Sequence, residues 1–263
     1  MLSELLCRNG GIIKVPDGVK YTRDDTIAVI SYASTSTANS VEAALKELKR
    51  KMPDAAIPSA DTVFNYIYEN EIEDILAFFR TINSEFLALT GIPDEPVDVA
   101  VDFHDKGYYG DKNDQGVRGI KPKNGTSWGY SYHTIDMLSE QKLTLDIVNI
   151  SGLNKDYAIL IEGIVKRVRA IGIKIGTMFL DREFFNRSTI RTLFDLEVEF
   201  IMAAKNNKRI KRMLEEHKRK NGVTPVIFKY QFKDTSSPEF YLVAIPNPDY
   251  DPEDAKNKNG VPR

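Results

Sequence analysis

Apolar residues in the first third of the chain recur at helical intervals. The pattern predicts an amphipathic helix over residues 41–52, after a capping pair at residues 39–40. A second helix begins after Ser59, and a longer one runs from residue 72 to the neighbourhood of Gly91. Ahead of these helices, the short run Thr26–Ile30 has the composition of a strand and stands among weakly patterned residues.

Two helices separated by a short break are the outline of a helix-turn-helix, a common DNA-binding motif. Here the break runs from Pro53 to Pro58. In this interpretation the second helix exposes Asp61, Thr62, Asn65 and Tyr66, and Thr62 and Asn65 are the candidate DNA-binding residues. A helical hairpin used only for packing has the same outline and is more common, so both interpretations remain open.

From residue 97 onward the pattern changes to short apolar runs separated by turn residues, which predicts strands. Three antiparallel strands are expected at Val97–Phe103, Gly129–Ile135 and Leu143–Ile150. The next elements expected are a helix at Asp156–Ile171, a buried strand at Ile175–Leu180, a helix capped by Asn186 or Ser188, and a strand at Glu199–Ala204. This order predicts an α/β fold with a mixed sheet. A strand pair, Val226–Phe232 and Phe240–Ile245, follows a basic segment.

Composition narrows the class of protein. With 263 residues, 42% hydrophobic and 28% charged, the chain is large enough for two domains. The single cysteine, Cys7, excludes an internal disulfide framework and a thiolate zinc cage. No long apolar run or signal-peptide pattern occurs, so a soluble, cytoplasmic protein without a membrane partner is expected. The net charge of −2 argues neither for nor against nucleic acid.

Two aspartates carry the candidate chemistry. Alternation along the first strand places Asp98, Asp102 and His104 on the face opposite Val99 and Val101. Another aspartate, at position 181, directly follows the buried strand that ends at residue 180, and sites in open α/β sheets form at such carboxyl ends. If the two strands are neighbours, the two carboxylates converge, and their repulsion favours a divalent cation between them. Taken singly, each residue is better explained as a surface aspartate or a helix cap.

The order of motifs supplies a more specific interpretation. Residues 97–205 resemble the catalytic core of a DDE transposase of the cut-and-paste insertion-sequence type, which has a ribonuclease H-like fold. The matching pieces are Val-Ala-Val-Asp102-Phe-His, Tyr108-Tyr-Gly110, Gly125-Thr-Ser-Trp-Gly-Tyr-Ser-Tyr-His133, Leu143-Thr-Leu145 and Phe179-Leu-Asp181-Arg-Glu-Phe184. The resemblance implies that Asp102 and Asp181 are catalytic residues that bind two Mg²⁺ or Mn²⁺ ions.

The resemblance also implies a third ligand, a glutamate on a helix that follows a strand-rich insertion. The candidate glutamates all precede that position; they are Glu183, Glu197, Glu199, Glu215 and Glu216. The chain is therefore expected to be the front portion of a transposase. Its expected domains are a helical, DNA-binding segment (1–92), an incomplete ribonuclease H-like core with flanking helices (93–205), and a basic helix with the start of the insertion (206–263).

The function implied is metal-dependent DNA strand cleavage and strand transfer at the ends of an insertion sequence. The expected partners are double-stranded DNA, as terminal repeats and as target, and a second copy in a homodimer on the nucleoid. Backbone phosphates would be neutralised by the basic residues Lys205, Lys208, Arg209 and Arg212. Two alternatives remain: a ribonuclease H-like nuclease that cuts without joining, and a non-catalytic DNA-binding remnant.

Overall fold

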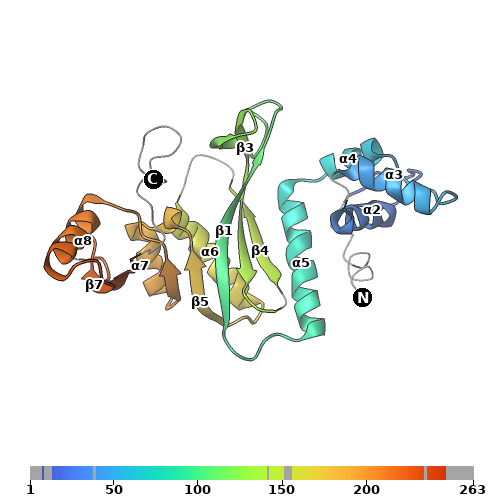
Figure 1. Cartoon of the computed structure of the whole chain (residues 1–263). Coiled ribbons are helices and arrows are strands. Elements are labelled where there is room, and N and C mark those ends of the chain that lie inside the picture. The colour runs from blue at the N-terminus through green and yellow to red at the C-terminus, as the bar shows by residue number, and fades with distance from the viewer. Residues whose placement is uncertain are drawn as a thin grey trace. The chain divides into compact units, whose positions relative to one another are not determined.

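A computed structural model describes residues 8, 14–37, 40–140, 142–150, 156–233 and 236–246. The chain forms two compact units, residues 1–179 and 180–263. The larger sheet has the strand order β2-β3-β1-β5-β6, with β4 paired to β3, and β7 and β8 form a separate two-stranded sheet (Figure 1). Among the described residues, no helix is both long and apolar enough to span a membrane. The end of the predicted insertion, residues 247–263, lies outside the described residues.

The elements expected from residue 41 onward occur in the predicted order, whereas the helix at Arg23–Thr35, the strand at Arg118–Lys123 and the short 3-10 helix at Arg182–Phe184 were not predicted. The first unit contains α2 (Arg23–Thr35), α3 (Val41–Lys51), α4 (Ala60–Tyr68), α5 (Ile72–Thr90), β1 (Val97–Gly107), β2 (Arg118–Lys123), β3 (Thr126–Met137), β4 (Leu143–Asn149), α6 (Tyr157–Ala170) and β5 (Ile175–Leu180). The second unit begins at the last residue of β5 and contains η2 (Arg182–Phe184), α7 (Arg187–Asp195), β6 (Glu199–Met202), α8 (Lys208–Asn221), β7 (Val226–Tyr230) and β8 (Phe240–Ala244).

The prediction of a strand at residues 26–30 is wrong, because this run lies inside α2. The helix starts in a capping box, in which the Thr22 hydroxyl accepts from the backbone of Asp25 and the Asp25 carboxylate accepts from the backbone of Thr22. Helical winding then brings Val29 into one core cluster with Leu45 of α3 and Val63 of α4. Capping and burial on one helix face outweigh the strand preference of a short apolar run.

The sheet around β1 has the predicted mixed directions. β1 pairs with β3 in antiparallel register, and β3 pairs antiparallel with both β2 and β4. On the other side of β1, the backbone N–H of Val97 donates to the carbonyl of Lys174 at 2.9 Å, and that of Thr177 donates to the Asp98 carboxylate at 2.8 Å. These contacts join the starts of β1 and β5, so the two strands run in the same direction. The α/β fold with a mixed sheet is therefore confirmed; its ribonuclease H-like identity stays a prediction.

The two faces of β1 differ as the alternation predicted. Val99 and Val101 are buried, whereas Asp98, Asp102 and His104 are exposed. On the apolar face the ring centroid of Phe103 lies 5.4 Å from that of Tyr157 at the start of α6. The start of α6 therefore packs on the valine face of β1, whereas the aspartate face is exposed.

A buried carboxylate anchors α5 and α6 to β4. Asp146, in β4, is only 2% exposed, and it accepts from Arg80 Nε of α5 at 2.8 Å and from Arg167 Nε of α6 at 2.7 Å. Arg80 also donates to the carbonyl of Ile147 at 3.0 Å. Figure 1 shows α5 running alongside β4. Charge pairing with two helices thus satisfies an acid that would otherwise destabilise the core.

The second unit has its own core. Buried side chains from α7, α8, β7 and β8 form one cluster with a residue that follows η2; these are Phe185, Ile190, Ile210, Tyr230 and Leu242. β7 and β8 pair in antiparallel register, with Tyr230 opposite Phe240. The Asn207 side chain caps α8 and also donates to the Tyr230 hydroxyl at 3.2 Å. The start of α8 is therefore fixed on the β7–β8 hairpin.

Candidate functional site

Asp102 lies in the middle of β1 on its open face. One of its oxygens accepts from the backbone N–H of Phe103 at 2.7 Å, and Thr134 stands directly opposite on β3. The Thr134 hydroxyl contacts His104 Nε2 at 3.2 Å and donates to Asp136 at 2.8 Å. Because Asp102 is exposed, no burial penalty demands a cation beside it. The case for this residue as a ligand rests on its position in the fold and on its oxygen chemistry.

Asp181 directly follows β5, as predicted. It is exposed, and its carboxylate caps η2 by accepting from the backbone N–H of Arg182 at 2.6 Å. Asp181 therefore has the capping role that was the alternative to metal binding, although one carboxylate can serve both purposes. Asp102 belongs to the first unit and Asp181 to the second. The fold of neither unit fixes the separation of the two carboxylates, so their convergence stays a prediction.

The donor set for a metal ion is limited. Within the part of the chain that the structure describes, no three His, Cys, Asp or Glu side chains cluster as a metal site. Asp102 and Asp181 supply hard carboxylate oxygens, the type that Mg²⁺ prefers, and Mg²⁺ commonly uses one or two carboxylates together with phosphate oxygens. The chemistry of the two side chains thus fits Mg²⁺ or Mn²⁺. The remaining ligands would be other oxygen atoms, such as those of a bound phosphate.

The predicted DNA-facing residues of α4 have different surroundings. Asn65 is exposed, and Thr62 is half-buried with its hydroxyl 2.9 Å from that of the capping Ser59. The prediction that Tyr66 is exposed is wrong, because it is 8% exposed and belongs to the core. The connection between α3 and α4 spans residues 52–59, longer than the three or four residues of a helix-turn-helix turn. The DNA-binding role of Thr62 and Asn65 stays a prediction.

Three of the four predicted phosphate-binding residues line one hollow in the second unit. Lys208, Arg209 and Arg212 belong to the first turns of α8, and Lys233, just after β7, lines the same hollow of about 580 Å³. Sequence analysis missed Lys233, because it lies thirteen positions after Lys220, the last residue of the basic run, in a segment without a charge pattern. The fourth predicted residue, Lys205, instead donates to the carbonyl of Glu183 at 3.2 Å.

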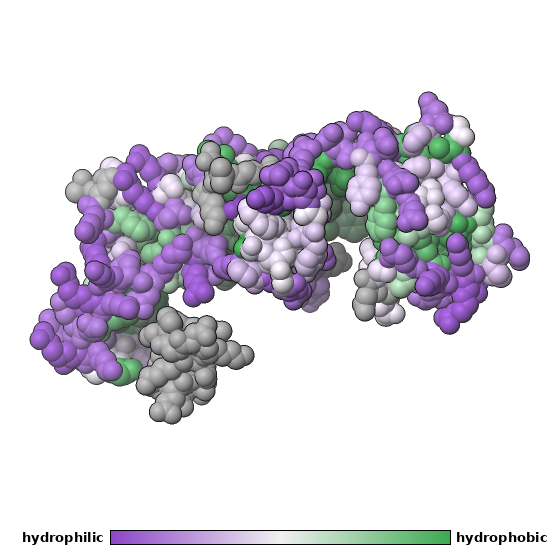
Figure 2. All heavy atoms as spheres, turned by 90° about the horizontal axis from the view of Figure 1, so that it is seen from above, coloured by the Kyte–Doolittle hydropathy of each residue, from purple (hydrophilic) through white to green (hydrophobic). Residues whose placement is uncertain are grey.

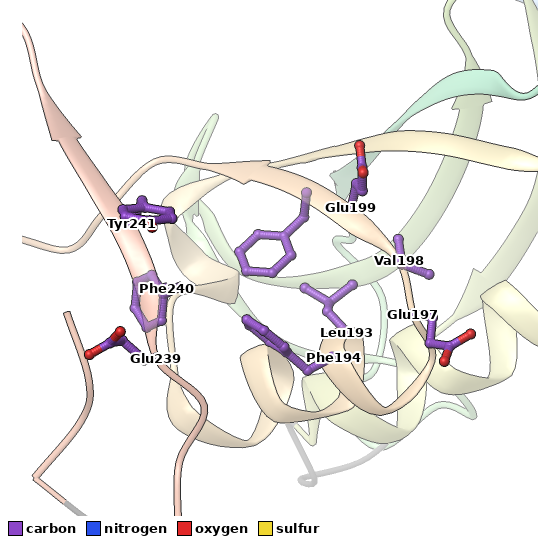
Figure 3. Close-up of a pocket in the computed structure, with 9 residues that line it drawn as sticks. Leu193, Phe194, Glu197, Val198, Glu199, Glu239, Phe240 and Tyr241 are labelled. Carbon is purple, nitrogen blue, oxygen red and sulfur yellow. The ribbon is translucent and has the colours of Figure 1, made fainter. Parts of the chain in front are cut away.

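Another hollow in the second unit, of about 770 Å³, has the opposite character. Its lining comes from α7, β6, β8 and the residues beside them: Leu193, Phe194, Glu197, Val198, Glu199, Phe200, Glu239, Phe240 and Tyr241. Figure 3 shows Phe194 and Phe240 turned toward the same space, with three glutamates around it. Lys229 pairs with Glu239 at 3.0 Å, which neutralises one of the three. The remaining acids would repel phosphate, so the lining of this hollow is poorly suited to a phosphate backbone.

Comparison with known proteins identifies a similar fold but no sequence relative. No protein-family model and no curated protein matches the chain. A solved piggyBac transposase synaptic complex with hairpin DNA is similar over 92% of this chain, with a TM-score of 0.52 and 14% identity. A Drosophila P element transposase strand transfer complex covers 82% of the chain at 10% identity, with a TM-score of 0.38. The chain spans 57% of the piggyBac chain, and at this identity the similarity shows a shared fold.

Proposed function

We propose that this chain carries part of the catalytic core of a DNA transposase, which cuts and joins DNA with the help of Mg²⁺ or Mn²⁺. The observation that supports this most is Asp102, an exposed carboxylate at the centre of a sheet whose fold resembles that of the piggyBac transposase. The hollow lined by Lys208, Arg209 and Arg212 adds a surface suited to phosphate. The insertion-sequence class, the terminal repeats and the homodimer belong to the same proposal.

The roles of the side chains follow from their chemistry. Asp102 and Asp181 would hold the metal ions, which when bound stabilise charge on the attacking and leaving oxygens of a phosphoryl transfer. The backbone N–H of Phe103 orients one oxygen of Asp102, and the side chain is exposed on the open face. The cations of α8 hold the DNA through its phosphates and read no sequence.

The test uses the chain extended to include the third glutamate that the resemblance implies, together with a supercoiled plasmid that carries labelled element ends. Asp102→Asn should lower Mg²⁺-dependent cutting and joining by more than about 100-fold. Loss of a residue that only supports a metal ligand costs up to about 100-fold, and loss of a ligand itself should cost more. DNA binding should persist. Asp136→Asn is the matched control, because Asp136 lies on the same face but is already engaged by Thr134 and Thr144.

The outcomes separate the candidate functions. Joined products that depend on Asp102 support a transposase, and cut products without joining support the nuclease alternative. Cutting that survives Asp102→Asn would refute the assignment of this residue. DNA binding with no cutting by the extended wild-type chain would favour the non-catalytic alternative.

A further inference from the structure

The cations at the start of α8 are arranged differently from those at its end. We propose that Lys208, Arg209, Arg212 and Lys233 form a binding cleft for a run of nucleic-acid backbone phosphates, and that the other basic residues of α8 do not share this role. The inference deepens the proposed function and rests on it for the choice of nucleic acid as the ligand.

The first argument is the convergence of positive charge from two segments. Three of the four residues come from α8, whereas Lys233 follows β7, and all four line one hollow and are exposed. Arg212 lies 3.8 Å from Glu216, a loose surface pair. Among the described residues, no carboxylate pairs with Lys208 or Lys233. Four like charges with one loose counter-ion among them raise the energy of the free protein, and a polyanion relieves that repulsion.

The second argument is the fixed position of Arg209. Its guanidinium donates to the carbonyl of Gln231 at 2.5 Å and lies 4.9 Å from the centroid of the Tyr230 ring. Asn207 caps the helix and reaches the same tyrosine. These contacts orient one wall of the cleft before any ligand arrives, so less rotamer freedom is lost on binding.

Size and lining select the kind of ligand. A hollow of about 580 Å³ is larger than a single phosphate ion. Every lining residue is a cation, and the nearby Tyr230 ring is covered by Arg209, so the cleft offers no face for base stacking. The chemistry therefore suits a sugar-phosphate backbone bound without regard to sequence.

The last turn of α8 provides a contrast within the same helix. Lys218, Arg219 and Lys220 lie at the carboxyl end, where cations stabilise the helix dipole. Their presence is thus explained by helix stability alone. Cations in the first turns have the opposite effect on the dipole, so ligand binding is the better explanation for them. Figure 2 shows hydrophilic side chains over the segment around α8.

A pair of matched triple variants tests the cleft. One replaces Lys208, Arg212 and Lys233 by glutamine, and the other replaces Lys218, Arg219 and Lys220 by glutamine. Each removes two lysines and one arginine, so the change in net charge is identical. Binding of an arbitrary duplex to the full chain is measured by fluorescence anisotropy between about 50 and 200 mM salt, and circular dichroism verifies folding of both variants.

The cleft variant should lower the slope of log K against log salt by about 2.7, three contacts at about 0.9 each. The single variant Lys233→Gln, which leaves α8 intact, should lower the slope by about 0.9. The variant in the last turn should leave the slope within about 0.9 of wild type. Equal slope changes in the two triple variants would overturn the proposal, because the helix would then act as a diffuse basic surface.

Two competitors distinguish the source of the anion. Displacement of the duplex by millimolar inorganic phosphate, or by polyglutamate as well as by DNA, would refute a cleft for the nucleic-acid backbone. Failure of the cleft proposal can be distinguished from failure of the proposed transposase function. With the cleft effect intact, cutting that is absent from the wild-type protein or that does not depend on Asp102 would reject the transposase. Asp102-dependent cutting without a cleft effect would reject only this inference.

Discussion

Replacing Asp146 by alanine should destabilise the first unit by about 3 kcal/mol. Removing one partner of a fully buried ion pair costs about 3–5 kcal/mol, because the remaining charge is left uncompensated. Asp146 is 2% exposed, but the Arg80 and Arg167 side chains are 33% and 39% exposed and can be rehydrated. The loss should therefore fall at the lower end of that range, which corresponds to a decrease in melting temperature of roughly 6–12 °C.

Urea unfolding of the full chain, followed by circular dichroism, measures the loss, and hydrogen exchange locates it. Amides of α5 and α6 should exchange faster, since these are the helices that the carboxylate anchors. Asp146→Asn keeps one acceptor oxygen and should cost less than Asp146→Ala, and Arg80→Ala or Arg167→Ala should each cost about 1.5 kcal/mol. A loss below about 1 kcal/mol for Asp146→Ala, with α5 and α6 still protected, would refute the anchoring argument.

Three other substitutions test contacts of the first unit. Gly176→Ala would place a Cβ 2.9 Å from the Asp98 carboxylate and should cost about 1–3 kcal/mol in urea unfolding, whereas Gly119→Ala, with nothing within 4 Å, should change stability by less than about 0.5 kcal/mol. Tyr108 donates a hydrogen bond to the Asp114 carboxylate, which raises the pKa of Tyr108 from 10.0 to about 12. The stability from this bond should be complete below about pH 10 and disappear as the pH rises through about 12. A phenolate absorbance titration of Asp114→Ala should show one tyrosine returning to an ordinary pKa, and identical titrations would contradict this.

Long periodic segments were predictable because capping and burial agree in them. Ser40 and Ser59 accept hydrogen bonds from the first turns of α3 and α4, and Gly91 follows the last residue of α5, as the sequence indicated. The prediction of a strand at residues 26–30 was wrong, because a run of only five residues is too short to distinguish the pattern of a strand from that of a helix. Its capping box lies outside that run, at Thr22 and Asp25.

Polar elements and distant partners were harder to predict. β2 went unrecognised because its sequence, Arg118–Lys123, is mostly polar and contains Pro122; the strand lies at the sheet edge, where proline is tolerated. The alternation along β1 correctly separated the Asp102 face from the valine face. The partners of Asp146 could not be inferred, because Arg80 lies 66 positions away and only the packing of α5 on β4 brings it close.

The hydrogen bond from Thr177 to the Asp98 carboxylate has a consequence for how the sheet assembles. Because side chains alternate along a strand, a slip of one position between β1 and β5 would exchange their inward and outward residues. Such a slip would turn Asp102 toward α6 and expose the valines. A Cβ at position 176 would lie 2.9 Å from the Asp98 carboxylate, so glycine at this position leaves room for Asp98. Asp98 and Gly176 therefore favour one register between β1 and β5. Neither residue takes part in the proposed chemistry, but this register keeps the Asp102 carboxylate on the exposed face.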